Sequence, residues 1–468
     1  MTISLENNWG AAGEKLTILI PTLKTSDSIN TQVFFGNAKA SILSVNPPHL
    51  NVMVPESSIS KVNVTVKILD MISNSVAFNY ITKYPKINTI TLRHRAIPGD
   101  TLVISGENFY AIGNKVLFSG NTVNVTSENS KEIKLIIPQN VSNVENIVVY
   151  CGSLSSNTVS FNFSVYSNPI YNHIADPTVI KANDGYFYAY ATENAGLVPI
   201  IKSKDLVSWS ACGSVFNTGT YPTFNTGNVW APDINYFNGK YVLYFSMSTW
   251  GGTWAAGIGV STADKPEGPF SIGKKMFISS EINVENSIDP CFVEANGKKY
   301  LFWGSFKGIY TVELEDDGLS VKSGAEKILI AGTAFEGTYI YRRGDYYYLF
   351  ASIGSCCNGL SSTYKTVVGR SKNLFGPYLN KKGNSMNNNA YEIVIKGNDN
   401  FVGTGHNSEI LTDDDGNDWI LFHAYDAKYP DEGRKLMLEK ITWTDDGWPT
   451  VNDGKNVPRV SATKPYFQ

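Results

Sequence analysis

The chain has 468 residues, 42% of them hydrophobic and 17% charged, so it lacks the low hydrophobicity and high charge of disordered proteins. At about 150 residues per domain this length predicts roughly three domains. The formal net charge of −3 gives no basic surface for a polyanion, so we expect no nucleic acid partner.

Neither a membrane segment nor an export signal is evident in the sequence. No stretch approaches the ~18 uninterrupted apolar residues of a membrane-spanning helix. The first residues, MTISLENNWG, lack a basic head followed by an apolar run. The five cysteines have no metal-type spacing and do not settle the redox compartment.

The first third of the chain contains one pattern twice. Val33-Phe-Phe-Gly36 and Ser73-Asn-Ser-Val-Ala-Phe-Asn79 recur 83 residues later as Val116-Leu-Phe-Ser119 and Ser156-Asn-Thr-Val-Ser-Phe-Asn162. Each copy consists of short alternating runs separated by Gly, Asn, Pro and Ser. Because alternation puts every second side chain on one face of a strand, the pattern predicts two immunoglobulin-like β-sandwiches, at 1–83 and 84–166.

The order of signals in each copy resembles the IPT/TIG family of immunoglobulin-like domains. A Gly-x-x-Leu-x-Ile run begins at Gly13 and Gly99, a Val-Pro or Ile-Pro pair follows, and the Ser-Asn-x-Val-x-Phe run ends the copy. Such modules serve as spacers or docking domains, or bind glycans directly. Their partner is not evident from the sequence.

From residue 167 to 468 a second pattern occurs five times. An acidic residue precedes an apolar run, a turn with Gly, and an aromatic run; these acids are Asp176, Asp233, Asp289, Glu336 and Glu409. Asn238-Gly239 and Asn296-Gly297 are typical of tight hairpin turns. Successive acids lie 47 to 73 residues apart, a little above the ~40–50 residues of a propeller blade. We therefore predict a five-bladed β-propeller, with 166–170 as the linker before it.

In a propeller the first strand of every blade lines the central axis, so we expect the five acids to meet at one mouth. Carboxylates brought close together cannot all ionise at their ordinary pKa, so such a cluster supplies both an acid and a base. Glycoside hydrolysis needs this pair. The alternative for any single copy is a turn, because Asp often begins one.

Aromatic side chains near the blade ends suggest a sugar-binding rim. They are Trp230, Trp250, Trp254, Trp303 and Phe306. Flat apolar faces stack on sugar rings, and core packing is the alternative for each of them. For Trp303, its strand position favours the core.

Several short motifs follow one another along the second pattern. In chain order they are Asp176-Pro-x-x-Ile, Trp230-Ala-Pro-Asp-Ile234, Ser287-Ile-Asp-Pro290 with Gly304-Ser-Phe306, Ala334-Phe-Glu336, Ser355-Cys-Cys-x-Gly359, Gly369-Arg-Ser371 with Gly376-Pro-Tyr378, and Gly405-His-Asn407. In this order they resemble glycoside hydrolase family 43, and most closely its arabinan endo-1,5-α-L-arabinanase branch. The resemblance covers about residues 167 to 460. It implies the five-bladed propeller that the hairpins predict separately.

The resemblance also implies roles for single residues. Asp176 would be the general base, Glu336 the general acid, and Asp289 the carboxylate that orients the acid and raises its pKa. Asp233 and Glu409 would be structural. Hydrolysis would invert the anomeric centre, and we expect the two catalytic carboxyl groups to lie about 6.5–9.5 Å apart.

Other implied site residues bind sugar or metal. Trp230, Asn286, Ser305 and Cys356 would contact substrate, with a vicinal disulfide between Cys356 and Cys357 possible. His406 would be the sole protein ligand of a largely hydrated calcium ion, the alternative being a buried histidine bonded to the backbone. The chain departs from the branch in having Ala175 before the base, Gly337 after the acid, and Gly403-Thr-Gly405 before His406.

The sequence therefore predicts an inverting hydrolase of α-1,5-linked L-arabinofuranosyl units in arabinan or a related plant cell-wall polysaccharide, acting in the periplasm, at the cell surface or after secretion. The alternatives are an exo-acting α-L-arabinofuranosidase or β-xylosidase, and a glycan-binding protein without turnover. Endo and exo action are not distinguished by sequence.

Overall fold

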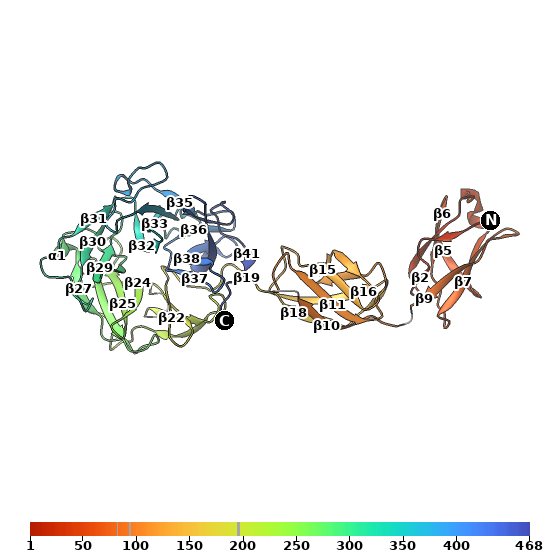
Figure 1. Cartoon of the computed structure of the whole chain (residues 1–468), viewed down its shortest axis with the longest axis horizontal. Coiled ribbons are helices and arrows are strands. Elements are labelled where there is room, and N and C mark those ends of the chain that lie inside the picture. Colours follow the sequence, from red (N-terminus) through yellow and green to blue (C-terminus); the bar gives the residue numbers. More distant parts are fainter. Residues whose placement is uncertain (82, 93–94, 194–196) are drawn as a thin grey trace. The chain divides into compact units, whose positions relative to one another are not determined.

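The structure, a computed structural model, describes residues 1–81, 83–92, 95–193 and 197–468. It divides into two compact units, Met1–Val165 and Tyr166–Gln468 (Figure 1). Both units are built from strands. In the described ranges the helices are short: α1 (Ser279–Ile282), η1 (Thr25–Ile29), η2 (Gly359–Ser361), η3 (Met386–Asn388) and η4 (Pro430–Glu432).

The first repeat forms an immunoglobulin-like sandwich with its strands linked in the order β1-β3-β6-β5-β4-β7-β9-β2, and β8 beside β7. Its strands are β1 (Ser4–Leu5), β2 (Trp9–Gly10), β3 (Lys15–Leu19), β4 (Thr31–Phe35), β5 (Ala38–Asn46), β6 (His49–Met53), β7 (Lys61–Ile68), β8 (Met71–Ile72) and β9 (Val76–Tyr80).

The second repeat forms two separate sheets, β10-β11-β15-β14 and β13-β12-β16-β17, with β18 beside β16. Its strands are β10 (Lys86–Leu92), β11 (Thr101–Glu107), β12 (Lys115–Phe118), β13 (Asn121–Val123), β14 (Val125–Glu128), β15 (Glu132–Ile136), β16 (Val144–Cys151), β17 (Leu154–Ser155) and β18 (Val159–Asn162).

Strand register confirms the duplication. Val33 pairs with Val66 between β4 and β7, and Val116 pairs with Val149 between β12 and β16, so both partners are shifted by the same 83 residues. All four valines are fully buried. The alternating pattern therefore places equivalent side chains in the core of each sandwich.

The second unit is a five-bladed propeller (Figure 1). The first three blades are β20 (Thr178–Lys181), β21 (Phe187–Tyr190), β22 (Pro199–Ser203) and β23 (Ser210–Ser214); β24 (Asn228–Phe237), β25 (Lys240–Ser248), β26 (Gly257–Ala263) and β27 (Lys274–Ile278); and β28 (Cys291–Ala295), β29 (Lys298–Trp303), β30 (Ile309–Glu313) and β31 (Ile328–Ala331).

The last two blades are joined by a single parallel bridge between β34 and β36. The fourth comprises β32 (Glu336–Arg343), β33 (Tyr346–Ile353), β34 (Lys365–Ser371) and β35 (Glu392–Ile395). The fifth comprises β36 (Phe401–Gly405), β37 (Ile410–Thr412), β38 (Asp418–Asp426), β39 (Arg434–Trp443) and β40 (Pro449–Val451).

The segment 166–170, which the sequence suggested as a linker, is part of the propeller. β19 (Val165–Ser167) pairs with β41 (Ser461–Thr463). The Asn168 side chain donates to the Leu438 carbonyl oxygen at 2.9 Å, and the Tyr166 hydroxyl donates to the same oxygen at 2.7 Å. The linker prediction was wrong because composition does not reveal that these polar side chains satisfy buried backbone groups.

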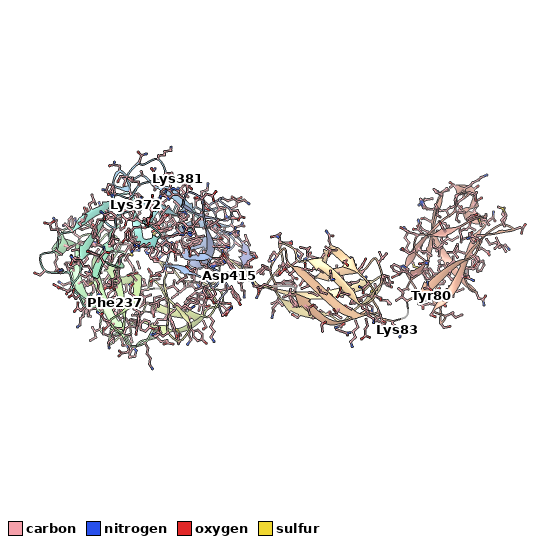
Figure 2. All side chains as sticks on the ribbon, in the orientation of Figure 1. Tyr80, Lys83, Phe237, Lys372, Lys381 and Asp415 are labelled. Carbon is pink, nitrogen blue, oxygen red and sulfur yellow. A yellow bond between two sulfur atoms is a disulfide. The ribbon has the colours of Figure 1, made fainter. Side chains whose placement is uncertain are left out.

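Hairpin turns and aromatic packing build the blades. Asn238 and Asn296 have φ values of 52° and 55°, and the glycines after them are also left-handed, as the two-residue hairpin requires. Between blades, Phe237 stacks on Phe292 with ring centroids 4.7 Å apart. Side chains of this kind fill the spaces between the ribbons (Figure 2), and the rigid frame fixes where each inner strand begins.

Candidate active site

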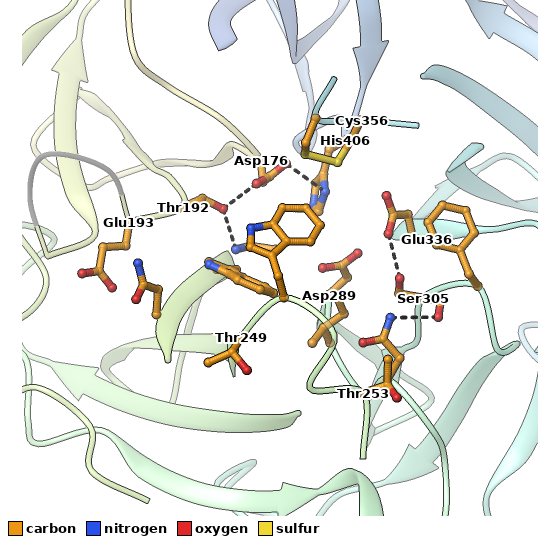
Figure 3. Close-up of a pocket in the computed structure, with 18 of the residues that line it drawn as sticks. Asp176, Thr192, Glu193, Thr249, Thr253, Asp289, Ser305, Glu336, Cys356 and His406 are labelled. Atoms are coloured by element: carbon orange, nitrogen blue, oxygen red, sulfur yellow. Dashed lines mark hydrogen bonds and ion pairs between the residues drawn. A yellow bond between two sulfur atoms is a disulfide. The ribbon is translucent and has the colours of Figure 1, made fainter. Parts of the chain in front are cut away.

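A cavity of about 450 Å³ opens at the end of the propeller axis where the inner strands of the blades begin. This volume lies in the usual range for small-molecule sites. The eight catalytic, sugar-binding and metal-binding residues that the family resemblance implies all line it: Asp176, Trp230, Asn286, Asp289, Ser305, Glu336, Cys356 and His406. Figure 3 labels six of them, all but Trp230 and Asn286. Residues up to 230 positions apart in the chain thus meet in one pocket.

Asp176 lies at the entrance to β20 with φ 52° and is 8% exposed. Its Oδ1 accepts a hydrogen bond from the Arg434 guanidinium at 2.8 Å and lies 3.3 Å from Nδ1 of His406. His423 Nδ1 lies 3.1 Å from Oδ1 and 3.1 Å from the Asp176 backbone nitrogen. The Thr192 hydroxyl donates to Oδ2 at 2.5 Å.

These neighbours keep Asp176 ionised. Burial alone would raise the pKa of Asp176, but the positive charge of Arg434, with smaller contributions from the neighbouring His406 and His423, outweighs burial and holds this pKa well below its usual range. Burial lowers the pKa of His423 to about 4 and also lowers that of His406, so both imidazoles are neutral at neutral pH. Asp176 is therefore available as a proton acceptor.

Glu336 begins β32 on the other side of the pocket and is 8% exposed. Its Oε2 accepts a hydrogen bond from the Ser305 hydroxyl at 2.7 Å (Figure 3). Burial and, to a smaller extent, the negative charge of Asp176 raise the pKa of Glu336 to about 7, against the opposing effects of Ser305, Tyr364 and Arg434. Glu336 thus holds a proton where Asp176 does not.

Asp289 lies beside Glu336. Its Oδ2 accepts a hydrogen bond from the backbone N–H of Gly337, the residue after the acid, at 3.0 Å. Burial, then the charges of Glu336 and Asp176, raise the pKa of Asp289 well above its usual range. The three carboxyl groups therefore carry unequal protonation in one small space, as acid–base chemistry requires.

Gly337 is a departure from the family pattern that the geometry explains. Its φ of 60° is in the left-handed region, and a Cβ at this position would lie 3.2 Å from Nδ1 of His406. A side chain here would be strained and would press on the imidazole.

Asp233 and Glu409 do not share the mouth with the other three acids, so the prediction of five acids at one mouth was wrong for these two. Ala231 of blade two and His406 of blade five line the mouth, and each precedes the acid of its blade in the chain. Asp233 and Glu409 therefore lie deeper along the axis. Thr178 donates to Glu409 at 2.6 Å, and Asp233 accepts from the Phe292 N–H at 2.8 Å.

This deeper pair joins several blades. Glu409 of blade five binds Thr178 and the Val179 N–H of blade one, while Asp233 of blade two binds Phe292 of blade three. Burial raises the pKa of Asp233 to about 7; burial and the charge of Asp233 raise that of Glu409 to about 8. The pair therefore retains protons at neutral pH.

We expect the free energy of unfolding of Asp233→Asn to fall less than that of wild type as pH rises from 5 to 9. Unfolded carboxyl groups titrate near pH 4, so the folded pair binds protons that the unfolded chain has released. The stability it contributes is complete below about pH 4 and is lost as pH rises through about 7 to 8. Urea unfolding at pH 5 to 9 measures this loss.

The control is Glu294→Gln, which changes an exposed carboxylate on β28. This control should lose stability with pH as the wild type does. An Asp233→Asn protein that loses as much stability as wild type between pH 5 and 9 would show that the deeper pair does not hold the extra protons.

Aromatic and sulfur groups form the rest of the pocket wall. Trp230 and Trp250 lie with ring centroids 5.6 Å apart, and both line the cavity with Phe306. Trp303 is fully buried and donates to Ser287, so it belongs to the core. Trp254 is half exposed and is not among the lining residues.

Cys356 and Cys357 form a vicinal disulfide that lines the pocket. Of the nominated sugar contacts, Asn286 donates to the Ser305 carbonyl oxygen at 3.2 Å, and Ser305 in turn binds the acid. These two residues therefore also orient Glu336.

Four pocket or near-pocket residues were not nominated from sequence: Thr192, Tyr364, His423 and Arg434. Thr192 and Arg434 bind the base directly. Tyr364 and His423 stack with ring centroids 5.6 Å apart. Each of the four follows or lies within an outer strand or a loop, where no local sequence pattern identifies it as a site residue. The only signal that could have pointed to any of them is an Arg or His buried within an aromatic strand run.

Metal-binding capacity near His406 is limited. Within residues 1–81, 83–92, 95–193 and 197–468, no group of three His, Cys, Asp or Glu side chains is arranged to hold a metal ion. The buried Oδ1 of Asn407, next to His406, has no hydrogen-bond partner in those ranges. One imidazole and one unpaired oxygen fit only an ion that keeps most of its water.

Sequence comparison places this site in a known context. The sequence profile of glycosyl hydrolases family 43 matches residues 166–449, and that of the IPT/TIG domain matches residues 2–80 and 85–163. The chain is 35% identical over 308 residues to an extracellular exo-α-(1→5)-L-arabinofuranosidase of Cellvibrio japonicus, covering 60% of this chain and 86% of that relative.

Two further comparisons agree. An extracellular endo-α-(1→5)-L-arabinanase of Bacillus subtilis is 36% identical over 290 residues, covering 59% of this chain and 86% of the relative. The solved structure of a Cellvibrio cellulosa α-L-arabinanase with arabinohexaose matches with a TM-score of 0.55 and 33% identity, covering 60% of this chain and 95% of the other.

Proposed function

The chain belongs to glycosyl hydrolases family 43 and carries two IPT/TIG domains; from this premise we propose that it hydrolyses α-1,5-linked L-arabinofuranosyl units of arabinan with inversion. The observation that carries the proposal is the unequal protonation of Asp176 and Glu336 across one cavity. Inverting hydrolysis requires one ionised and one protonated carboxyl group on opposite sides of the sugar.

Asp176 acts as the base. With Arg434 and Thr192 holding its two oxygens, the carboxylate takes a proton from a water molecule as that water attacks the anomeric carbon. The bond to the departing oxygen breaks as Glu336 donates its proton to that oxygen. The products are a sugar of opposite anomeric configuration and a shortened chain.

Asp289 supports the acid. By accepting a hydrogen bond from the Gly337 N–H, Asp289 fixes the first residues of β32 and hence the direction of the Glu336 side chain. Asp289 and Glu336 also disfavour each other's full ionisation, because two adjacent buried carboxylates repel each other. Asp289 therefore positions the acid and belongs to the same coupled group of carboxyls.

Calcium is a further part of the proposal. His406, assisted by the Asn407 amide oxygen, would hold a mostly hydrated calcium ion near the base, where its positive charge would favour the ionised form of Asp176. Arg434 already supplies a positive charge to Asp176, so the ion adds to an existing field.

We expect His406→Ala to lose bound calcium while remaining folded. Elemental analysis of purified, dialysed protein should find less calcium per chain in the variant than in wild type. Thr404→Val, which changes a buried residue two positions away, is the matched control and should keep the metal. Equal calcium content in wild type and His406→Ala would refute the assignment of His406 as ligand.

Product analysis on debranched arabinan tests the activity itself. Wild type should release arabinose or arabino-oligosaccharides from this polymer. Mixed oligomers early in the reaction indicate endo action, whereas arabinose or one short product from the start indicates exo action. Hydrolysis of aryl β-xyloside but not of arabinan would favour a β-xylosidase instead.

The site of action is proposed from the relatives, two of which are named as extracellular. No helix in the described ranges is long and apolar enough to cross a membrane. We infer that the enzyme acts on polysaccharide outside the cytoplasm, with the IPT/TIG domains as spacer or docking modules.

A further inference from the structure

The two oxygens of the base have different surroundings. Oδ1 of Asp176 faces the Arg434 guanidinium at 2.8 Å and the Nδ1 atoms of His423 and His406 at 3.1 and 3.3 Å. Oδ2 has one hydrogen-bond partner among the residues that the structure describes, the Thr192 hydroxyl at 2.5 Å (Figure 3). A carboxylate oxygen has two lone pairs, so Oδ2 retains one for water.

Charge also separates the two oxygens. A proton arriving on Oδ1 would have to lie against the guanidinium of Arg434, which already donates to that atom. Placing two positive groups on one oxygen is unfavourable in a buried site. Oδ2 is therefore the oxygen that can accept the proton from the attacking water.

The direction of the Thr192 hydroxyl is fixed by a third residue. The backbone N–H of Ala231 donates to Oγ1 of Thr192 at 2.9 Å. Because an amide N–H can only donate, the single hydroxyl proton of Thr192 is left to point at Asp176. Ala231 lies at a bulge in β24 with φ 41°, and this local distortion aims its N–H at Thr192.

Thr192 is itself held firmly. Its backbone N–H donates to the Ala175 carbonyl oxygen at 3.0 Å, directly before the base, and the residue is 8% exposed. The hydroxyl thus stands at a constant position relative to the backbone of Asp176. A swing of the carboxylate would break its bond with Thr192.

We propose that Thr192 is a positioning residue that fixes Oδ2 of Asp176 as the proton acceptor and aims its remaining lone pair at the attacking water. The inference rests on the proposed function and adds to it a residue and an atom. Ala231, through its N–H, sets the direction of the hydroxyl and links the base to the wall that carries Trp230.

The test compares Thr192→Val with Thr192→Ser on debranched arabinan. Valine keeps the branched shape and removes the hydroxyl, whereas serine keeps the hydroxyl. Because the lost hydrogen bond is to a charged group, kcat of the valine variant should fall about 10- to 100-fold with KM nearly unchanged. Serine should recover most of kcat.

Two kinetic results would overturn the proposal. One is a valine variant in which both kcat and KM equal those of wild type. The other is a raised KM at unchanged kcat, which would mean that the hydroxyl serves only to hold the Trp230 wall through Ala231. Thermal unfolding of both variants shows whether either has lost its fold.

A crystal structure of Thr192→Val separates this inference from the proposed function. A rotated or displaced Asp176 carboxylate supports the positioning role, even if wild type proves inactive on arabinan and the proposed function fails. An Asp176 side chain in its wild-type place, with Oδ2 unmoved, contradicts it.

Discussion

Asp176→Asn should hydrolyse linear arabinan about 10²- to 10⁴-fold more slowly than wild type, with KM little changed. Asparagine preserves the shape of the side chain and can still meet Arg434 and Thr192, but it cannot accept a proton from water. The loss should be the same on every substrate, because water must be activated whichever group departs. Initial rates over a range of arabinan concentrations measure kcat and KM separately.

Asp233→Asn is the matched control for this variant. It makes the same chemical change in an equally buried residue on the same axis, outside the pocket lining. At pH 6 it should keep most of its turnover. An Asp176→Asn enzyme as active as this control would remove Asp176 from the mechanism.

Glu336→Gln should lose about 10²- to 10⁴-fold on arabinan but much less on an aryl arabinofuranoside with an acidic phenol. A sugar hydroxyl leaves only when it is protonated, whereas an acidic phenolate departs without help. The difference between the two substrates is therefore specific to the acid, and Asp176→Asn should not show it. Parallel assays of both variants on both substrates measure this difference.

The pH profile on arabinan provides a second readout for the acid. Glu336 must be protonated to act, and its pKa is raised to about 7, so kcat should fall as pH rises through that value. This fall should disappear in Glu336→Gln acting on the aryl substrate. If wild type and Glu336→Gln release sugar from linear and branched arabinan and from an aryl β-xyloside at the same negligible rates, the protein is a glycan-binding module and not a hydrolase.

The fold was predictable because its signals are local. Asn238-Gly239 and Asn296-Gly297 form hairpin turns that need no distant contact. In the two sandwiches, the alternation of valines along each strand directly predicts which side chains are buried. The pocket carboxylates could be nominated for a related reason. Each lies at the start of an inner strand, and a propeller brings these starts together.

Contacts between blades were beyond prediction from sequence. Thr192 reaches the base from the end of the second strand of blade one, and Arg434 reaches it from blade five. No periodicity in the sequence relates these two positions to that of Asp176. The depth of Asp233 depends on the bulge in β24, a shift that the spacing of acids along the chain does not show. The contacts to the base and the depth of Asp233 both depend on how neighbouring blades pack against each other.

The central claim is that water, activated by Asp176, attacks the sugar directly from the side opposite Glu336. Proton NMR of the first products from an α-L-arabinofuranosyl oligosaccharide, recorded before mutarotation, tests this most directly. The account predicts that the β-anomer appears first and the α-anomer follows as it equilibrates. Initial appearance of the α-anomer would mean that configuration is retained through a covalent intermediate, and would contradict the account.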